Sequence, residues 1–179
     1  GKVRAEVGFG PRNLGRRGTE LDAAVATALD AVGLTNDAET NPYDLGYSRR
    51  KLLALASVLA METPIVVLDE PTTGQDARGV ARVQAIVRDV SAAGRTVIAI
   101  SHDMRFVAET FDRIVVMQAG RVVLDGSPAD VFAEESWPAL AGTHLEPPLA
   151  ATVGARLGLG RTPTETSLVD AIVYAAGGR

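Results

Sequence analysis

The chain has 179 residues, which suits one domain of ordinary size or part of a larger protein. Hydrophobic residues make up 46% and charged residues 22%, which excludes a disordered, collagen-like or coiled-coil chain. The net charge of −4 argues against binding nucleic acid through a basic surface, and the lack of cysteine excludes a thiolate nucleophile or a Cys-based zinc site.

The first third of the chain predicts a helical region. Residues 9–15 are rich in Gly and Pro and predict a loop. Apolar residues recur at three- and four-residue steps over 19–32, which predicts an amphipathic helix closed by Gly33. A second helix is predicted over 48–61, and its apolar run is too short to cross a membrane.

The middle of the chain predicts a βαβ unit. The short apolar runs 65–68 and 96–100 are rich in β-branched residues and do not alternate with polar ones. This pattern is typical of strands that are covered on both faces in a parallel sheet. A helical stripe over 80–90 lies between the two runs and is closed by Gly94.

The last third predicts a different topology. Residues 114–117 and 121–124 predict a β-hairpin with Gly120 at the bend. A final helix is predicted to begin at a capping box in residues 162–165 and to end at 177–178.

Polar residues that suit catalysis follow both strands of the predicted βαβ unit. Asp69 and Glu70 follow the first strand, and His102 follows the second. Ligands of open parallel sheets bind outside the carboxyl ends of the strands, where these side chains are expected to meet. We interpret Asp69 as a magnesium ligand, Glu70 as the group that orients a water, and His102 as a contact to a terminal phosphate. The alternative is that the acids start a loop and the histidine caps a helix.

A second candidate site lies at residues 44–51, where the helix over 48–61 begins. Three cations, residues 49–51, occupy its first turn, where the helix dipole disfavours positive charge. A helix N-terminus with free backbone N–H groups and Gly46 beside it suits an anion, and a phosphate would relieve the repulsion. The alternative is that the three cations point into water.

Four short segments resemble motifs of the ATP-binding-cassette (ABC) ATPases. Residues 65–72 look like the Walker B segment, 74–76 like the D-loop and 100–103 like the switch-histidine loop. Residues 45–49 stand where this family carries its signature, Leu-Ser-Gly-Gly-Gln. The order and spacing of the four segments are more specific than any one of them alone.

Two loops, 9–15 and 125–128, further resemble the ATPase subunits of energy-coupling-factor importers, which take up vitamins and transition-metal ions such as cobalt. The resemblance implies an α/β fold, the carboxyl-terminal part of a P-loop ABC ATPase domain with a parallel sheet core and a helical subdomain. The implied parts are a helical subdomain at 1–62, the second half of the ATPase core at 63–135 and a C-terminal helical extension at 136–179.

The resemblance implies that the full-length protein binds ATP and Mg²⁺ and couples ATP hydrolysis to solute import. Glu70 and His102 would then be catalytic and Asp69 would hold the metal. The residues that would contact the nucleotide are Gly46, Tyr47, Ser48, Arg49 and Asp76. The implied partners are a transmembrane transporter subunit, a second ABC ATPase in a head-to-tail dimer and a substrate-binding membrane subunit. The implied location is peripheral, on the cytoplasmic face of the cell membrane.

The sequence departs from the family pattern in two ways. The phosphate-binding loop Gly-x-x-x-x-Gly-Lys-[Ser/Thr] and the Q-loop glutamine are absent, so the chain resembles a cassette entered just past its Q-loop. We therefore expect these residues by themselves to bind ATP weakly and to fold poorly, and calorimetry giving a micromolar affinity would contradict the first expectation. Gly46 replaces the signature serine and Tyr47 and Ser48 replace its glycines, which indicates an asymmetric pair of ATP sites.

Two alternative functions stay open on the sequence. The first is an ABC ATPase that acts on DNA or ribosomes, whose relatives carry zinc-binding cysteines, long heptad arms or basic linkers that this chain lacks. The second is a non-catalytic regulatory remnant, which only the missing phosphate-binding loop supports. The sequence favours the transport ATPase.

Overall fold

The computed structural model describes residues 1–177. They form two compact units, residues 1–100 and the residues from Ser101 onward. No helix among the described residues has the length and apolar character needed to span a membrane. The predicted helix stop at Gly178 lies outside the described residues.

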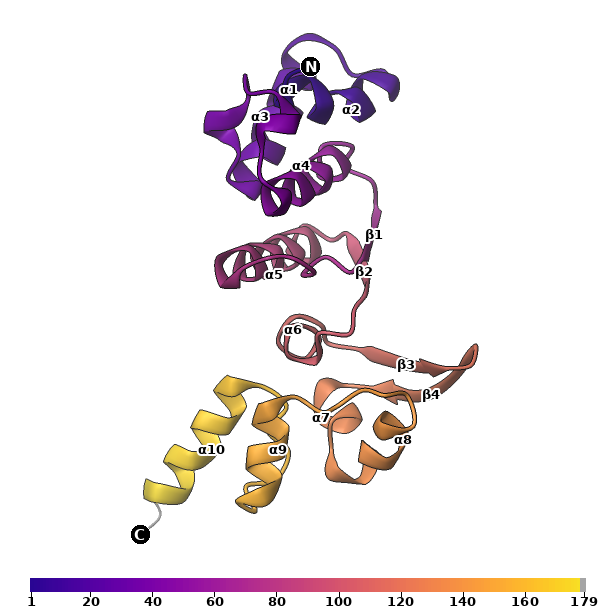
Figure 1. The fold of residues 1–179 in the computed structure, drawn as a ribbon, viewed down its shortest axis with the longest axis vertical. Coiled ribbons are helices and arrows are strands. Elements are labelled where there is room, and N and C mark those ends of the chain that lie inside the picture. The colour runs from indigo at the N-terminus through magenta and orange to yellow at the C-terminus, as the bar shows by residue number, and fades with distance from the viewer. Residues whose placement is uncertain (178–179) are drawn as a thin grey trace. The chain divides into compact units, whose positions relative to one another are not determined.

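The first unit begins with a cluster of helices, of which α1, α3 and α4 pack against one another (Figure 1). The predicted helices over 19–32 and 48–61 are confirmed to within two residues at each end. The core between them is apolar and contains buried residues from all three helices, among them Val7, Val25, Leu29, Leu52 and Ala56. The elements are α1 (Val3–Val7), α2 (Phe9–Asn13), α3 (Gly18–Val32), η1 (Thr35–Asp37), η2 (Pro42–Asp44) and α4 (Tyr47–Leu59).

Helix α2 occupies most of residues 9–15, so the prediction of a loop there is wrong. Gly10 lies against Met61, and a Cβ atom at Gly10 would be only 2.7 Å from Met61 Cγ. Pro11 is buried in the first turn of α2, where its missing N–H costs no helical hydrogen bond. Gly10 and Pro11 therefore serve close packing in this segment, whereas Gly15, with a φ of 95°, lies in the turn that follows α2.

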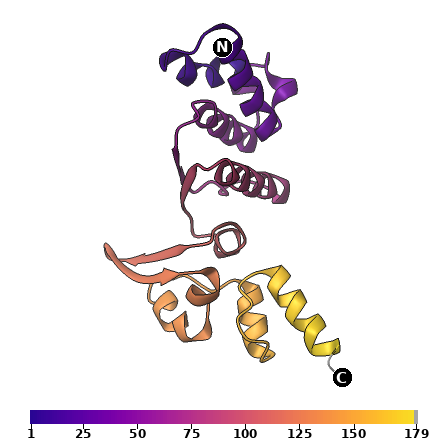
Figure 2. The ribbon, with the colours of Figure 1, turned by 180° about the vertical axis from the view of Figure 1, so that it is seen from behind.

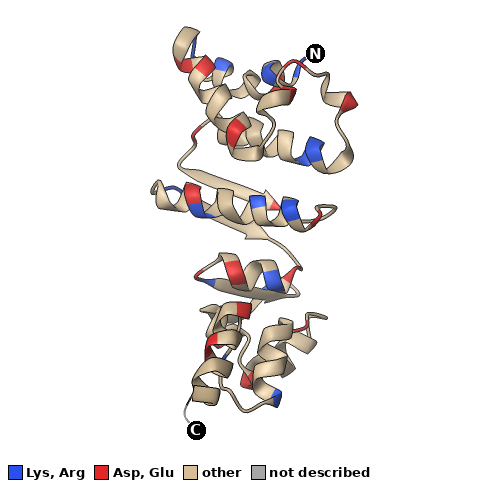
Figure 3. Ribbon diagram, turned by 90° about the vertical axis from the view of Figure 1, so that its left-hand side faces the viewer, with Lys and Arg blue, Asp and Glu red and all other residues tan. Residues whose placement is uncertain are grey.

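The predicted βαβ unit is confirmed and consists of β1 (Ile65–Asp69), α5 (Ala77–Ala92) and β2 (Thr96–Ile100). The strands are parallel neighbours, with Asp69 opposite Ile100 at their carboxyl ends. Helix α5 runs along the strands, and Figure 3 shows it in front of them with charged positions spaced along its length. Its apolar stripe is buried and comprises Val83, Ile86, Val87 and Val90.

Only one face of this two-stranded sheet is covered within the described residues. On the other face lie Ile65, Val67, Ile98 and Ile100, whose exposed fractions range from 49% to 60%. The expectation that both faces are covered is therefore not met within the first unit. Apolar residues on both faces are typical of strands that lie between two layers, and the first unit supplies one of these layers.

The second unit begins with α6 (Met104–Thr110) and the hairpin of β3 (Ile114–Gln118) and β4 (Arg121–Gly126), which is also visible from behind in Figure 2. The predicted hairpin is confirmed. Its two turn residues, Ala119 and Gly120, have φ angles of 48° and 77°, as a type I′ turn requires. Arg113 and Asp125 form a two-pronged ion pair at the base of the hairpin, and the hydrogen bonds from Arg113 lower the pKa of Asp125.

Short helices complete the second unit: α7 (Pro128–Val131), η3 (Glu134–Ser136), α8 (Trp137–Ala141), α9 (Leu149–Arg156) and α10 (Glu165–Gly177). Helix α10 packs against α9.

The cap of α10 differs from the prediction. Thr164 and Ser167 cap the helix reciprocally, because each backbone N–H donates to the other hydroxyl at 3.1 Å. Thr162 is instead 2% exposed, and its hydroxyl donates to the Ala150 carbonyl at 2.9 Å. The predicted box of Thr162 and Glu165 is therefore wrong, because Thr162 serves the packing of this segment on α9.

Candidate functional site

The two predicted acids lie at the carboxyl end of β1. Asp69 is the last residue of the strand, and the Glu70 N–H donates to the Ile100 carbonyl at 2.9 Å, which extends the ladder by one residue. Glu70 has a φ of 49°, a left-handed conformation that non-glycine residues seldom adopt. Thr73 Oγ1 donates to Glu70 Oε2 at 3.1 Å. The carboxylate is thus held just beyond the strand end by a strained backbone and a hydroxyl.

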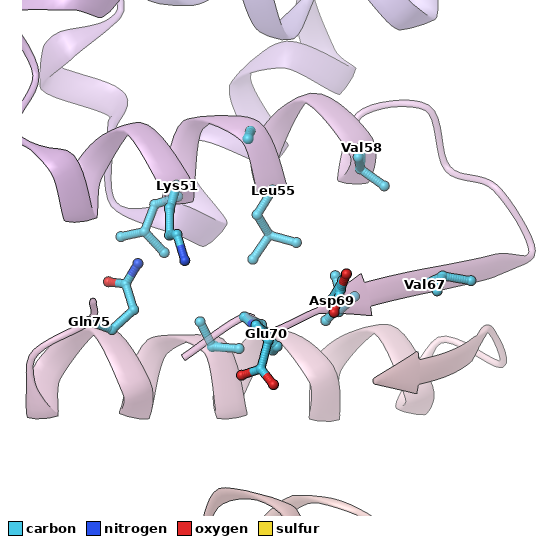
Figure 4. Close-up of a pocket in the computed structure, with 12 residues that line it drawn as sticks. Lys51, Leu55, Val58, Val67, Asp69, Glu70 and Gln75 are labelled. Atoms are coloured by element: carbon cyan, nitrogen blue, oxygen red, sulfur yellow. The ribbon is translucent and has the colours of Figure 1, made fainter. Parts of the chain in front are cut away.

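A pocket of about 240 Å³ lies between α4 and β1, and Figure 4 shows it. Its walls are mainly aliphatic and include Leu55 and Val58 from α4 and Val67 from β1. Asp69 and Glu70 supply carboxylates to its lining. Pockets that enclose whole drug-sized ligands usually measure about 300–1,000 Å³, so this one is too small to enclose a nucleotide.

The donor set at this strand end fits a magnesium ion that is carried mainly by phosphate oxygens and water. Among residues 1–177 no three or more His, Cys, Asp or Glu side chains gather into a group that could hold a metal ion. Mg²⁺ usually binds proteins through one or two carboxylates, with the remaining positions taken by water and substrate phosphates. Asp69 is suited to that role, which stays a prediction.

The second candidate site lies at the start of α4. Gly46 is the N-cap residue and has no side chain to cap the helix, and a Cβ atom there would meet open space. Its φ of −61° is open to any residue. The backbone N–H groups of the first turn are therefore not capped by a side chain at this position, as the anion-site interpretation requires.

All three cations of the first turn are bound by acceptors of the chain itself. Arg49 forms an ion pair with Asp37, whose side chain is 17% exposed. Arg50 Nη1 donates to the Leu45 carbonyl at 3.0 Å, and Lys51 Nζ donates to the Thr73 carbonyl at 2.7 Å. Arg49 and Arg50 are nevertheless exposed, so the alternative in which the three cations point into water stays open beside these hydrogen bonds. Contact of Arg49 with a phosphate stays a prediction.

The start of α4 also contacts the loop that follows β1, which the sequence did not reveal. Tyr47 lies against Gly74, where a Cβ atom would be 2.5 Å from Tyr47 Cε1. Ser48 Oγ donates to Gln75 Oε1 at 2.5 Å, and Gln75 Nε2 donates to the Ser48 carbonyl at 3.2 Å. The predicted signature and D-loop residues therefore meet within the first unit.

The two remaining predicted residues, Asp76 and His102, lie in different parts of the structure. Asp76 is the N-cap of α5, and its Oδ1 accepts from the Gly79 N–H at 2.8 Å. His102 is exposed and belongs to the second unit. Asp103, rather than His102, caps α6, because its Oδ1 accepts from the Phe106 N–H at 3.0 Å. The meeting of His102 with the acid pair and the contact of Asp76 with nucleotide both stay predictions.

Comparisons with known proteins find similarity to ATP-binding proteins of ABC transporters. The ATP-binding protein EcfA2 of the energy-coupling factor transporter of Lactobacillus delbrueckii subsp. bulgaricus is 38% identical over 177 residues, which are 95% of this chain and 61% of that protein. EcfA of Methanocaldococcus jannaschii is 36% identical over 132 residues, 74% of this chain and 47% of that protein. No family model matches the chain.

A solved structure supports the same assignment. CbiO1 of Clostridium perfringens, described as part of the ABC transporter complex CbiONQ, is 32% identical with a TM-score of 0.69. The match covers 88% of this chain and 58% of that one. The curated relatives are longer than this chain, which spans about half to three fifths of EcfA and EcfA2, as the shares of 47% and 61% show.

The fold and these matches show that the chain is similar to part of an ABC-type ATPase domain. Within that class its homologues include the ATP-binding proteins of energy-coupling factor transporters.

Proposed function

We propose that these residues belong to an ATP-binding and ATP-hydrolysing subunit of an energy-coupling-factor importer. The observation that carries the proposal is the 38% identity to EcfA2 along 95% of the chain. An acid pair at the end of β1 and a start of α4 without a side-chain cap are the features that such a subunit needs for handling phosphate.

Each candidate residue has a role in this proposal. Glu70 orients and deprotonates the water that attacks the terminal phosphate of ATP, and His102 contacts that phosphate. Asp69 would hold Mg²⁺ directly or through a water, and such an ion would supply positive charge to the phosphates. The start of α4, from Gly46 to Arg49, and Asp76 face a nucleotide held mainly by a second ATPase subunit in a head-to-tail dimer.

The proposed partners are a transmembrane transporter subunit and a separate membrane subunit that chooses the solute. The complex sits with its ATPases at the cytoplasmic face of the membrane and imports a vitamin or a transition-metal ion. The names of the relatives support the transporter class: energy-coupling factor transporter for EcfA2 and CbiONQ complex for CbiO1.

Vesicles reconstituted with the full-length protein and its membrane partners test this function. We expect accumulation of labelled cobalt or of one vitamin that requires ATP and stops when this subunit is left out. ATP hydrolysis that proceeds without any coupled uptake would favour an ABC ATPase outside transport. A complex that takes up solute equally well without hydrolysis by this subunit would favour a regulatory remnant.

Replacing Gly46 with Ser should raise ATP turnover at the site that this signature completes, by about two- to tenfold. The open space at Gly46 accommodates the hydroxyl, which would both cap α4 and offer a donor to phosphate. Tyr47 and Ser48 are less suitable for substitution because both already contact the loop after β1. Steady-state phosphate release measures the effect, and Gly46→Ala, which fills the same space without a hydroxyl, is the control.

A further inference from the structure

The start of α4 and the loop after β1 are joined by a set of contacts centred on Gln75. Its side-chain amide exchanges two hydrogen bonds with Ser48, one through the Ser48 hydroxyl and one through the Ser48 carbonyl. Lys51, one turn further along α4, reaches the same loop at the Thr73 carbonyl. Figure 4 shows Lys51 and Gln75 on the same side of the pocket.

Two glycines create the space for these contacts. A Cβ atom on Gly79 would be 2.3 Å from Gln75 Oε1 and 3.0 Å from Gln75 Cβ, so any larger residue would displace the amide. A Cβ atom on Gly74 would collide with the Tyr47 ring, and Gly74 has a φ of 75°. The side chains of Tyr47 and Gln75 therefore fill two slots that only glycine leaves open.

Gln75 also stands beside the start of α5. The next residue, Asp76, caps α5 through the N–H of Gly79, the same glycine on which the Gln75 side chain lies. A displacement of Ser48 would thus be carried through Gln75 to the N-terminus of α5.

We propose that Gln75 is a positioning residue that ties the start of α4 to residues 72–79, so that both segments respond to nucleotide as one body. The inference rests on the proposed function, because it takes the start of α4 to face a phosphate. The Ser48 hydroxyl already donates its hydrogen to Gln75 Oε1. A phosphate that accepts a hydrogen bond from the Ser48 hydroxyl would therefore take that bond away from Gln75.

Hydrogen–deuterium exchange on the full-length ATPase complex tests the tie. Gln75→Met keeps the length of the side chain and removes both hydrogen bonds, and Ser48→Ala removes the one through the hydroxyl. Without nucleotide, Gln75→Met should speed exchange about tenfold in residues 48–52 and in residues 75–80 together. The control is Ser57→Ala on the same helix, because Ser57 Oγ donates at 3.1 Å to Leu53 of α4 itself. It should leave both segments unchanged.

The second measurement repeats the exchange experiment in the presence of ATP. In the wild-type complex ATP should slow exchange in both segments, whereas in Gln75→Met only residues 48–52 should respond, and the KM for ATP should rise about fivefold. The double variant of Gln75→Met and Ser48→Ala should resemble Gln75→Met alone. The Gln75 substitution already removes both hydrogen bonds to Ser48, so the second substitution has none left to remove.

Two results would overturn the proposal. The first is an unchanged exchange rate in Gln75→Met without nucleotide. The second is a double variant whose increase in exchange rate equals the product of the increases in the two single variants. If the wild-type complex neither binds nor hydrolyses ATP, the proposed function fails. The nucleotide-free exchange then still decides whether Gln75 ties the two segments.

Discussion

Replacing Glu70 with Gln in the full-length protein is expected to lower ATP hydrolysis at least about 100-fold and to change ATP affinity less than about twofold. A positioned general base contributes about 10²–10⁴ to the rate, and the amide cannot take a proton from water. The substitution keeps the shape of the side chain and an oxygen that can accept from Thr73. The folded structure should therefore persist while the chemistry stops.

Single-turnover phosphate release measures the rate, and a fluorescent nucleotide measures binding. Glu6→Gln is the matched control, because Glu6 is exposed on α1, and it should retain wild-type activity. Equal rates of phosphate release for wild type and Glu70→Gln would show that Glu70 is not the general base and would support the regulatory alternative.

Replacing Gly154 with Ala is expected to destabilise the second unit by about 2 kcal/mol, although Ala ordinarily stabilises a helix interior by about 1 kcal/mol relative to Gly. Gly154 is buried in α9, and a Cβ atom there would be 1.8 Å from Thr162 Oγ1. Thr162 must then move and give up its hydrogen bond to the Ala150 carbonyl. The expected sign is opposite to that of helix propensity, which makes the result decisive.

Thermal or urea unfolding of the full-length protein measures this change. Ala155→Gly, one residue further along α9, reports the cost of helix propensity alone, about 1 kcal/mol. Adding Thr162→Ala to Gly154→Ala removes the colliding hydroxyl, so the double variant should be more stable than the sum of the single effects. A Gly154→Ala protein that is more stable than wild type would contradict the close approach.

The regular elements of this fold could be predicted from the local sequence, because the spacing of their apolar residues and the residues at their ends indicate the same element. The stripe over 19–32, the runs at 65–68 and 96–100 and the Gly120 hairpin all fall within observed elements. The prediction for 9–15 failed because Gly10 packs against Met61 and Pro11 is buried in α2, and Gly and Pro are equally typical of a turn. Nothing local could separate the two.

The candidate site was predictable only in part, for a related reason. The acids stand at a strand end, so the short apolar runs and the rule for parallel sheets located them at the edge of the sheet. The Arg49–Asp37 ion pair and the Ser48–Gln75 hydrogen bonds join residues that are 12 and 27 positions apart. Such pairings depend on how α4 lies against η1 and against the loop after β1, which neither charge nor spacing encodes. Gly74 and Gly79, which leave the space for the contacts with α4, are the trace of them in the sequence.

The left-handed backbone of Glu70 bears on attempts to engineer this protein. A non-glycine residue in that conformation costs about 1–3 kcal/mol, which Gly would recover at once. A thermostability screen without an activity readout would therefore enrich for glycine at this position and discard the acid. Variants of greater heat resistance obtained in that way should be sequenced at the codon for Glu70 before their ATPase activity is assayed.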